Sequence, residues 1–259
     1  MTTRPKRQLG QHFLADENIL AVIGRLAELD HRDVVLEIGP GLGVLTTYLA
    51  ERVARVHAVE LDRSLEPRLR EALSGRENVD LHFGDALALD LNTYEPPSTK
   101  LVSNLPYTIA TPLVAESLAG LPSVGLWCVM VQREVADRFF AVPGTKAYGA
   151  VSVLVQLVAD RIGFHPVSRN VFRPRPNVDS ALVAFRRRGA LPQPWPRIKH
   201  VVEAAFAHRR KTLPNSLQLA GLAERERAAA ALAAIGRDAA VRAEALAPPE
   251  FVALAAALG

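Results

Sequence analysis

The stretch "DVVLEIGPGLGVLTTYLAERV" (Asp33–Val53) joins a short apolar run, three closely spaced glycines and a segment whose apolar residues recur at helical spacing. A short apolar run that ends at glycine is typical of a buried strand, and the later spacing predicts a helix. Glycines between a strand and a helix permit a tight turn and let a ligand approach the helix N-terminus. The stretch therefore predicts the first strand, ligand loop and helix of a parallel α/β sheet.

Strand and helix patterns alternate along most of the chain. Other strands are expected over residues 55–61, 78–87, 100–107, 125–132, 151–167 and 180–188. Other helices are expected over residues 18–29, 64–74 and 133–140. This alternation predicts a doubly wound, Rossmann-like sheet that is mainly parallel, with one or two of the later strands pairing antiparallel.

The composition changes near residues 187–197, where "RRGALPQPWPR" combines glycine, three prolines and charge, as linkers do. Beyond it, alanine and leucine recur at helical periodicity, and helices are expected within residues 197–217, 224–236 and 248–259. The sequence thus predicts an α/β domain over residues 1–188 and a small all-α domain over residues 189–259.

The charge is unevenly distributed. The formal net charge is only +4, but basic residues cluster in "RPKR" (Arg4–Arg7), "RRR" (Arg186–Arg188) and "RRK" (Arg209–Lys211). Such clusters suit a polyanionic partner, although solvated helix ends produce similar runs.

Cysteine content and the N-terminus indicate the compartment. The single cysteine, Cys128, lies in an apolar run and is expected to be a core residue, so neither disulfides nor a thiolate metal site is expected. The basic N-terminus has no apolar signal region, and no stretch approaches the roughly 18 apolar residues of a membrane span. We expect a soluble, cytoplasmic protein without a metal.

Three successive strand ends carry residues that suit an adenosyl cofactor. Gly39, Gly41 and Gly43 have the spacing G-x-G-x-G, which differs from the G-x-G-x-x-G fingerprint and disfavours NAD. Glu60 ends the next strand, where a carboxylate can accept hydrogen bonds from both ribose hydroxyls. Asp85 follows the third strand, where it can accept a hydrogen bond from the adenine amino group. Together they predict an S-adenosylmethionine site.

The motif "NLPY" (Asn104–Tyr107) follows the fourth strand and fits the (Asn/Asp)-Pro-Pro-(Tyr/Phe) pattern of amino-group methyltransferases. The lone pair of an exocyclic amine is delocalised into the ring, so acceptors must hold the amine hydrogens in a reactive geometry. We expect the Asn104 side-chain oxygen and the Leu105 carbonyl to be those acceptors, Pro106 to fix the turn and Tyr107 to stack on the base.

The chemistry requires little beyond positioning. A sulfonium is already an activated methyl donor, so an in-line arrangement can supply most of the catalysis, and we expect no catalytic histidine or lysine. A target base must leave its stack to reach such a pocket. In "FRPRP", Phe172 is expected either to form the other face of a base clamp or to be a core residue.

The chain closely resembles the bacterial small-subunit (16S) ribosomal RNA adenine dimethyltransferases, the KsgA/RsmA family. The resemblance runs nearly end to end and is carried by "LGQHFL", "EIGPGLGVLT", "VELD", "GDAL", "NLPY", "VQREVADR", "FRPRPNVDSALV" and "AAFAHRRKTL". It implies a Rossmann-like methyltransferase that transfers four methyl groups from S-adenosylmethionine, yielding S-adenosylhomocysteine. The targets would be N6 of two adjacent adenosines in a hairpin loop near the 3′ end of that RNA, within assembling small (30S) subunits.

The resemblance also implies residue roles. It adds His12 and Leu14 to the cofactor contacts Gly39, Glu60, Asp85 and Asn104, although many relatives have Asn at the position of His12. Together with the charge, it assigns the "RRK" residues Arg209, Arg210 and Lys211 to RNA backbone contacts on a helix. It further implies a monomer with a late role in ribosome assembly.

Three alternatives stay open. The nearest is the related large-subunit RNA methyltransferase that modifies one adenosine, and a DNA adenine methyltransferase is more distant. The third is a ribosome-assembly factor whose catalytic residues matter little. Intact Glu60, Asp85 and Asn104 favour retained activity.

Overall fold

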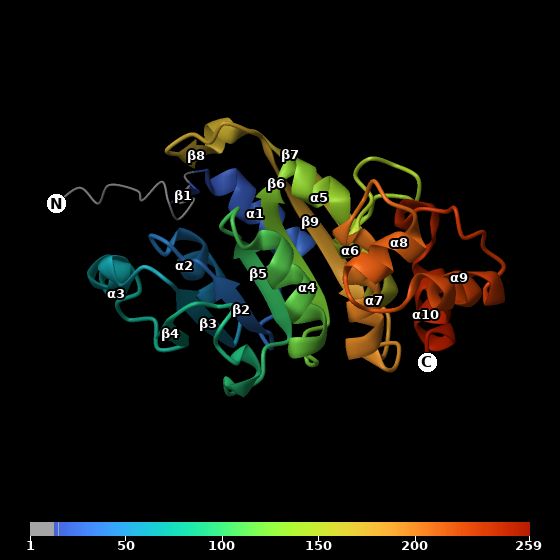
Figure 1. Cartoon of the computed structure of the whole chain (residues 1–259). Coiled ribbons are helices and arrows are strands. Elements are labelled where there is room, and N and C mark those ends of the chain that lie inside the picture. The colour runs from blue at the N-terminus through green and yellow to red at the C-terminus, as the bar shows by residue number, and fades with distance from the viewer. Residues whose placement is uncertain (1–12, 15) are drawn as a thin grey trace. The chain divides into compact units, whose positions relative to one another are not determined.

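The computed structural model describes residues 13–14 and 16–259 (Figure 1). Its contacts divide the chain into two compact units, residues 1–136 with 160–187, and residues 137–159 with 188–259. This division differs from the expected domains because residues 137–159, and Arg188 at the boundary, group with the C-terminal helices. Of the helices in the described part of the chain, none is both long and apolar enough to cross a bilayer.

The first unit is built on a seven-stranded sheet in the order β4-β3-β2-β5-β6-β9-β7. Strands β2 to β6 pair in parallel, and β9 is antiparallel to β6, as the sequence predicts. A separate antiparallel pair joins β1 and β8. The strands are β1 Phe13–Leu14, β2 Val34–Ile38, β3 Arg55–Glu60, β4 Val79–Phe83, β5 Lys100–Asn104, β6 Leu126–Gln132, β7 Ala159–Val167, β8 Phe172–Arg173 and β9 Ser180–Arg187.

Helices cover both faces of this sheet, which makes it doubly wound (Figure 1). Helices α1 (Glu17–Leu26) and α2 (Val44–Ala50) pack through buried leucines and isoleucines on the face that includes Val35, Cys128 and Leu182. Helix α4 (Ala110–Gly120) contacts the other face, where Ser117 Oγ accepts a 2.9 Å hydrogen bond from the indole of Trp127. The remaining helices that begin in this unit are α3 (Glu66–Ala72) and α5 (Arg133–Phe139), whose last three residues belong to the second unit.

The sheet order reverses at β2, which lies between β3 and β5. In a parallel sheet, such a reversal opens a crevice at the carboxyl ends of the strands, because the two connecting segments leave on opposite faces. The glycine loop follows β2 and the "NLPY" motif follows β5. The topology therefore brings the two motifs to the same crevice.

The second unit is helical and contains α6 (Ala150–Val158), α7 (Trp195–Ala207), α8 (Leu213–Leu219), α9 (Arg225–Ala234) and α10 (Pro248–Ala257). Residues 151–158 were expected to be strand, and this expectation is wrong. Most of α6 is buried, so its valines and leucines show no polar face that would reveal a helical period. Ser152 Oγ accepts the Gly149 N–H at 3.0 Å, which satisfies a donor at the start of the helix.

Candidate functional site

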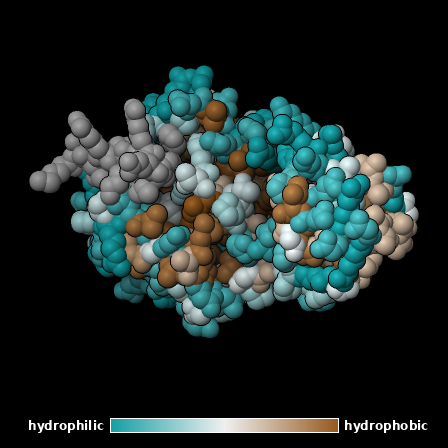
Figure 2. All heavy atoms as spheres, in the orientation of Figure 1, coloured by the Kyte–Doolittle hydropathy of each residue, from teal (hydrophilic) through white to brown (hydrophobic). Residues whose placement is uncertain are grey.

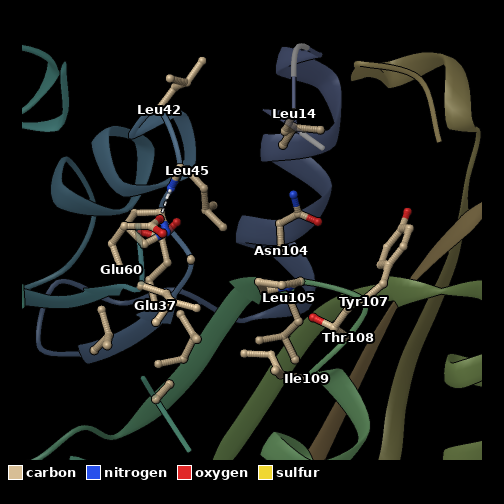
Figure 3. Close-up of a pocket in the computed structure, with 18 of the residues that line it drawn as sticks. Leu14, Glu37, Leu42, Leu45, Glu60, Asn104, Leu105, Tyr107, Thr108 and Ile109 are labelled. Atoms are coloured by element: carbon tan, nitrogen blue, oxygen red, sulfur yellow. Dashed lines mark hydrogen bonds between the residues drawn. The ribbon is translucent and has the colours of Figure 1, made fainter. Parts of the chain in front are cut away.

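A cavity opens at the carboxyl ends of β2 to β5 (Figure 3). Its walls come from the glycine loop, the ends of β3 and β4, and the segment Asn104–Ile109. The predicted site residues that line it are Leu14, Gly39, Gly41, Glu60, Asp85, Asn104, Leu105, Pro106 and Tyr107. The fold thus brings together residues that are 90 positions apart in the sequence, from Leu14 to Asn104.

Glu60 is held rigidly at the end of β3. Its Oε2 accepts the Gly41 N–H at 3.1 Å and its Oε1 accepts the Asp62 N–H at 2.8 Å. The side chain is 5% exposed, and burial raises the pKa of the carboxyl, while the hydrogen bonds from Asp62 and Gly41 oppose that rise. Each oxygen retains a second lone pair for another donor, so this carboxylate can also accept from ligand hydroxyls.

The glycine loop and the "NLPY" turn are in close contact. Gly39 has φ +75°, and a Cβ at this position would lie 3.1 Å from Pro106 Cγ. Its N–H donates to the Val59 carbonyl at 2.8 Å, which fixes the loop to β3. A side chain at residue 39 would therefore both strain the backbone and push Pro106 away.

Asp85 lies at the cavity wall and stabilises the turn after β4. Its Oδ1 accepts the Leu87 N–H at 2.9 Å, and the preceding Gly84 N–H donates to the Glu60 carbonyl at 2.9 Å. Among the described residues, Asp85 Oδ2 has no hydrogen-bond partner. This oxygen can accept from an amino group at the wall.

The "NLPY" turn leaves β5 in a defined conformation. Asn104 pairs with Met130, and the Leu105 N–H donates to the Met130 carbonyl at 3.0 Å, so β6 fixes the start of the turn. The Ile109 N–H donates to the Pro106 carbonyl at 3.1 Å, which leads the chain into α4. In Figure 3 the Asn104 side chain points into the cavity between Glu60 and Tyr107.

Tyr107 is anchored by the antiparallel strand. Its phenolic oxygen lies 2.6 Å from Ser180 Oγ at the start of β9. Burial raises the pKa of the phenol, and nearby Asp179 adds to that rise, so Tyr107 is neutral at ordinary pH. The ring is thus held at the cavity wall as a neutral aromatic surface.

Glu37 is a cavity residue that the sequence-based reasoning did not single out. It is 1% exposed, and its Oε2 has no hydrogen-bond partner among the described residues. Burial raises the pKa of this carboxyl to about 8, Thr46 opposes the rise, and Glu60 adds to it. An acidic residue inside the apolar run "DVVLEIG" was the available signal, because ionisable groups seldom enter a buried strand without a role.

Phe172 does not fit the expected clamp. It is 0% exposed and belongs to the hydrophobic core, and in the pairing of β1 with β8 its partner is Leu14. A ring without accessible surface cannot stack on a base, so the clamp prediction is wrong and Phe172 is a core residue. Its backbone pairing supports the cavity wall at Leu14. His12 lies outside the described residues.

The "RRK" residues are exposed, as a phosphate contact requires, but they lie in the turn between α7 and α8 rather than on a helix. Arg209 Nη2 donates to the carbonyls of Lys146 and Tyr148, both at 3.0 Å, and lies 3.6 Å from Glu244 Oε2. Arg210 and Lys211 form no ion pair with a described residue. Their contact with RNA stays a prediction.

The cavity suits S-adenosylmethionine by its donors and acceptors. Glu60 offers fixed carboxylate oxygens for ribose hydroxyls, Asp85 offers an acceptor for an adenine amine, and Leu42 and Ala86 offer apolar walls. Within residues 13–14 and 16–259, no cluster of three or more His, Cys, Asp or Glu could hold a metal ion. Cys128 is buried, and burial raises the pKa of its thiol to about 12, so it is a core residue rather than a nucleophile.

Comparison with known proteins identifies the family of this chain. The profile of the family described as ribosomal RNA adenine dimethylase matches residues 2–248. The chain is 49% identical to ribosomal RNA small subunit methyltransferase A of Rubrobacter xylanophilus, over 98% of this chain and 95% of that protein. It is 42% identical to the protein of the same name from Moorella thermoacetica, over 98% and 92%.

Solved structures share the architecture. The 23S rRNA methyltransferase ErmE aligns with a TM-score of 0.66 at 30% identity, over 95% of this chain and 99% of that one. A dimethyladenosine transferase from Plasmodium falciparum aligns with a TM-score of 0.76 at 23% identity, over 94% and 96%, which indicates the shared fold. With the family profile spanning nearly its whole length, this chain belongs to the ribosomal RNA adenine dimethylase family.

Proposed function

We propose that this protein transfers methyl groups from S-adenosylmethionine to N6 of two adjacent adenosines in a hairpin loop near the 3′ end of the 16S RNA. One observation carries the reaction type: Asn104 at the end of β5 and Tyr107 in the turn after it line the same cavity as the glycine loop and Glu60. The small-subunit RNA is supported by the 49% identity to a ribosomal RNA small subunit methyltransferase A.

When bound, S-adenosylmethionine supplies a methyl group activated by its sulfonium. The Asn104 side-chain oxygen and the Leu105 carbonyl accept the two hydrogens of the adenine amine, which turns the nitrogen lone pair toward the methyl group. Tyr107 stacks on the flipped base, and its hydroxyl, held by Ser180, fixes the plane of the ring. Pro106 against Gly39 keeps this turn close to the cofactor loop.

These residues catalyse by position rather than by proton transfer. By holding the amine nitrogen toward the methyl group that a bound cofactor would present, these residues would lower the entropic barrier of the reaction. After the first transfer the nitrogen carries a positive charge and two hydrogens, so it is acidic, and water can accept one of these protons. The first product keeps one amine hydrogen, for which either acceptor suffices, so the same site can add the second methyl group.

The alternative substrate is an adenosine of the large subunit, because ErmE is 30% identical over almost the entire chain. Higher identity to the small-subunit enzymes favours the small subunit. We also propose that the protein acts as a monomer on assembling subunits in the cytoplasm, with the exposed Arg210 and Lys211 contacting RNA phosphates and an accompanying role in assembly.

The test uses unmodified small subunits, large subunits and DNA, each incubated with the protein and methyl-labelled S-adenosylmethionine. We expect label in the small subunits, recovered as dimethyladenosine after digestion of the RNA. Label confined to large subunits would establish the alternative substrate. If the protein binds both the cofactor and the small subunit but transfers no methyl group, its function would be in ribosome assembly.

A further inference from the structure

A segment with three arginines lies beside the cavity in the first unit. Arg169, Arg173 and Arg175 occupy a 3-10 turn (Arg169–Val171), strand β8 and the loop after it. Phe172 pairs with Leu14, which lines the cavity, and Ser180 beyond the segment holds Tyr107. The segment is thus tied to the site through Phe172 at its centre and through Ser180, which follows it in the chain.

Hydrogen bonds to the main chain hold two of these arginines in place. Arg169 Nη1 donates to the Asn177 carbonyl at 2.9 Å, and its backbone N–H donates to Asp179 Oδ1 at 3.0 Å. Arg173 Nη1 donates to the carbonyls of Asn170 and Phe172, at 2.9 and 3.0 Å. Backbone carbonyls carry no net charge, so these bonds orient the guanidinium groups without neutralising them.

The positive charge of the segment is therefore available. None of the three guanidinium groups forms an ion pair with a residue that the structure describes, and Arg175 makes no hydrogen bond there either. Elsewhere in this unit, arginines do pair with carboxylates, as Arg186 does with Glu28. Arg173 and Arg175 are exposed, and Figure 2 shows a mainly hydrophilic surface over this segment at the top of the view.

Prolines on both sides of Arg175 restrict its backbone. A long cationic side chain on a stiff, exposed support loses little backbone entropy on binding, and its planar fork matches phosphate oxygens. Three guanidinium groups within seven residues, none of them in an ion pair with a described residue, suit a polyanion whose charges repeat along a strand.

We propose that Arg169, Arg173 and Arg175 form a phosphate-binding surface that holds the RNA strand next to the target adenosine. The inference rests on the proposed function and deepens it, since it assigns a second RNA contact, in the catalytic unit. The arginines act as positioning residues: they fix the backbone that flanks the base, so that the base can leave its stack and enter the cavity.

The test compares Arg175→Ala with Arg175→Lys and with Arg25→Ala. Arg25 is a matched control because it is an exposed arginine far from the cavity. It lies near the end of α1, and Glu28, three residues later, accepts a hydrogen bond through its carbonyl from Lys100. Lys100 begins β5, whereas Asn104 at the cavity ends it. Binding of unmodified small subunits is measured without cofactor at several salt concentrations, and initial rates of methylation give KM and kcat separately.

We expect Arg175→Ala to raise Kd and KM roughly fivefold to tenfold, with kcat within twofold. The slope of log Kd against log salt should decrease by about 0.7 to 0.9, the value for one lost phosphate contact. Arg175→Lys should keep the wild-type slope, because it keeps the charge, and Arg25→Ala should behave as wild type. Cofactor affinity should not change in any of them.

A wild-type Kd and salt slope in the double variant Arg173→Ala/Arg175→Ala would overturn the proposal. The binding measurement does not depend on methylation, so it tests the arginine surface separately from the proposed methyltransferase function. If the wild-type protein binds subunits but does not methylate them, the proposed function fails, while the arginine surface is still tested by the slope.

Discussion

The phenolic oxygen of Tyr107 lies 2.6 Å from Ser180 Oγ, and this hydrogen bond links the "NLPY" turn to the antiparallel strand β9. Ser180 is 1% exposed, so water cannot replace Tyr107 as its partner. The bond therefore fixes the aromatic ring at the cavity wall.

Removing the Tyr107 hydroxyl should reduce stability more than activity. Tyr107→Phe keeps the ring that stacks on the base but leaves a buried hydroxyl without a partner, at a cost of about 1–3 kcal/mol in the free energy of unfolding. The double variant Tyr107→Phe/Ser180→Ala should recover part of that loss, because neither partner then remains unpaired. Urea unfolding measures the cycle, and additive losses would mean that the bond contributes nothing.

Asn104→Ala should abolish methyl transfer and leave the protein folded. The variant loses an acceptor for the amine hydrogens, which should lower kcat at least ~100-fold by the magnitude typical of one oriented polar group. Asn92→Ala, at an exposed asparagine in the 3-10 turn between β4 and β5, is the matched control. Unchanged turnover in Asn104→Ala would remove this side chain from the mechanism, whereas a parallel loss of cofactor binding would make it chiefly a cofactor ligand.

Glu60→Gln should weaken cofactor binding at least about tenfold. Glu60 accepts from both Gly41 and Asp62, so an amide nitrogen in its place must face one of these N–H donors. The repulsion disturbs the loop, and the ribose hydroxyls lose a charged acceptor. The combined loss of binding free energy should exceed the ~1.4 kcal/mol that corresponds to a factor of ten in affinity. Calorimetry with S-adenosylmethionine measures it. Glu66→Gln, on the first turn of α3 and paired with Arg70, should bind the cofactor as wild type does.

Phe172→Ala tests the corrected assignment of this residue. A fully buried phenylalanine in the core should cost about 3–5 kcal/mol when truncated to alanine. Phe172→Leu should cost less and should keep the KM for RNA close to wild type. A stable Phe172→Leu variant with a strongly raised KM for RNA would instead restore the clamp.

Much of the sheet and its site was predictable because the strands are short apolar runs that end at glycines or polar residues. Glu60, Asp85 and Asn104 each follow such a run, and parallel topology places all three at one edge. The close approach of Pro106 to Gly39 was not predictable, because the two residues belong to motifs that are far apart in the sequence.

Other features depend on tertiary packing that local sequence does not encode. The run "AVSVLVQLV" has the β-branched character of a strand, yet burial makes it helix α6, since packing overrides weak local propensities. Phe172 shows the same limit. Arg173 and Arg175 in "FRPRP" are exposed and cationic, whereas Phe172, which pairs with Leu14, is fully buried in the core.

Glu37 should make stability depend on pH between about 4.5 and 8. Burial raises the pKa of its carboxyl from 4.5 to about 8, so in this range the unfolded chain loses the proton while the folded protein keeps it. Folding then binds a proton, and the free energy of unfolding falls as pH rises, by up to about 1.4 kcal/mol per pH unit. Below pH 4.5 both states are protonated, and above pH 8 the loss is complete.

The variant Glu37→Gln cannot ionise and should lack this slope. The amide changes the free energy of unfolding by an amount that does not depend on pH. As pH rises from 5 to 8, the free energy of unfolding of the wild type should therefore fall relative to that of the variant. Urea unfolding of the cofactor-free proteins at several pH values measures that difference, and Glu66→Gln controls for the removal of a carboxylate outside the core. Parallel curves for Glu37→Gln and wild type would show that Glu37 is ionised in the folded protein throughout this range, with a partner or water that compensates for its burial.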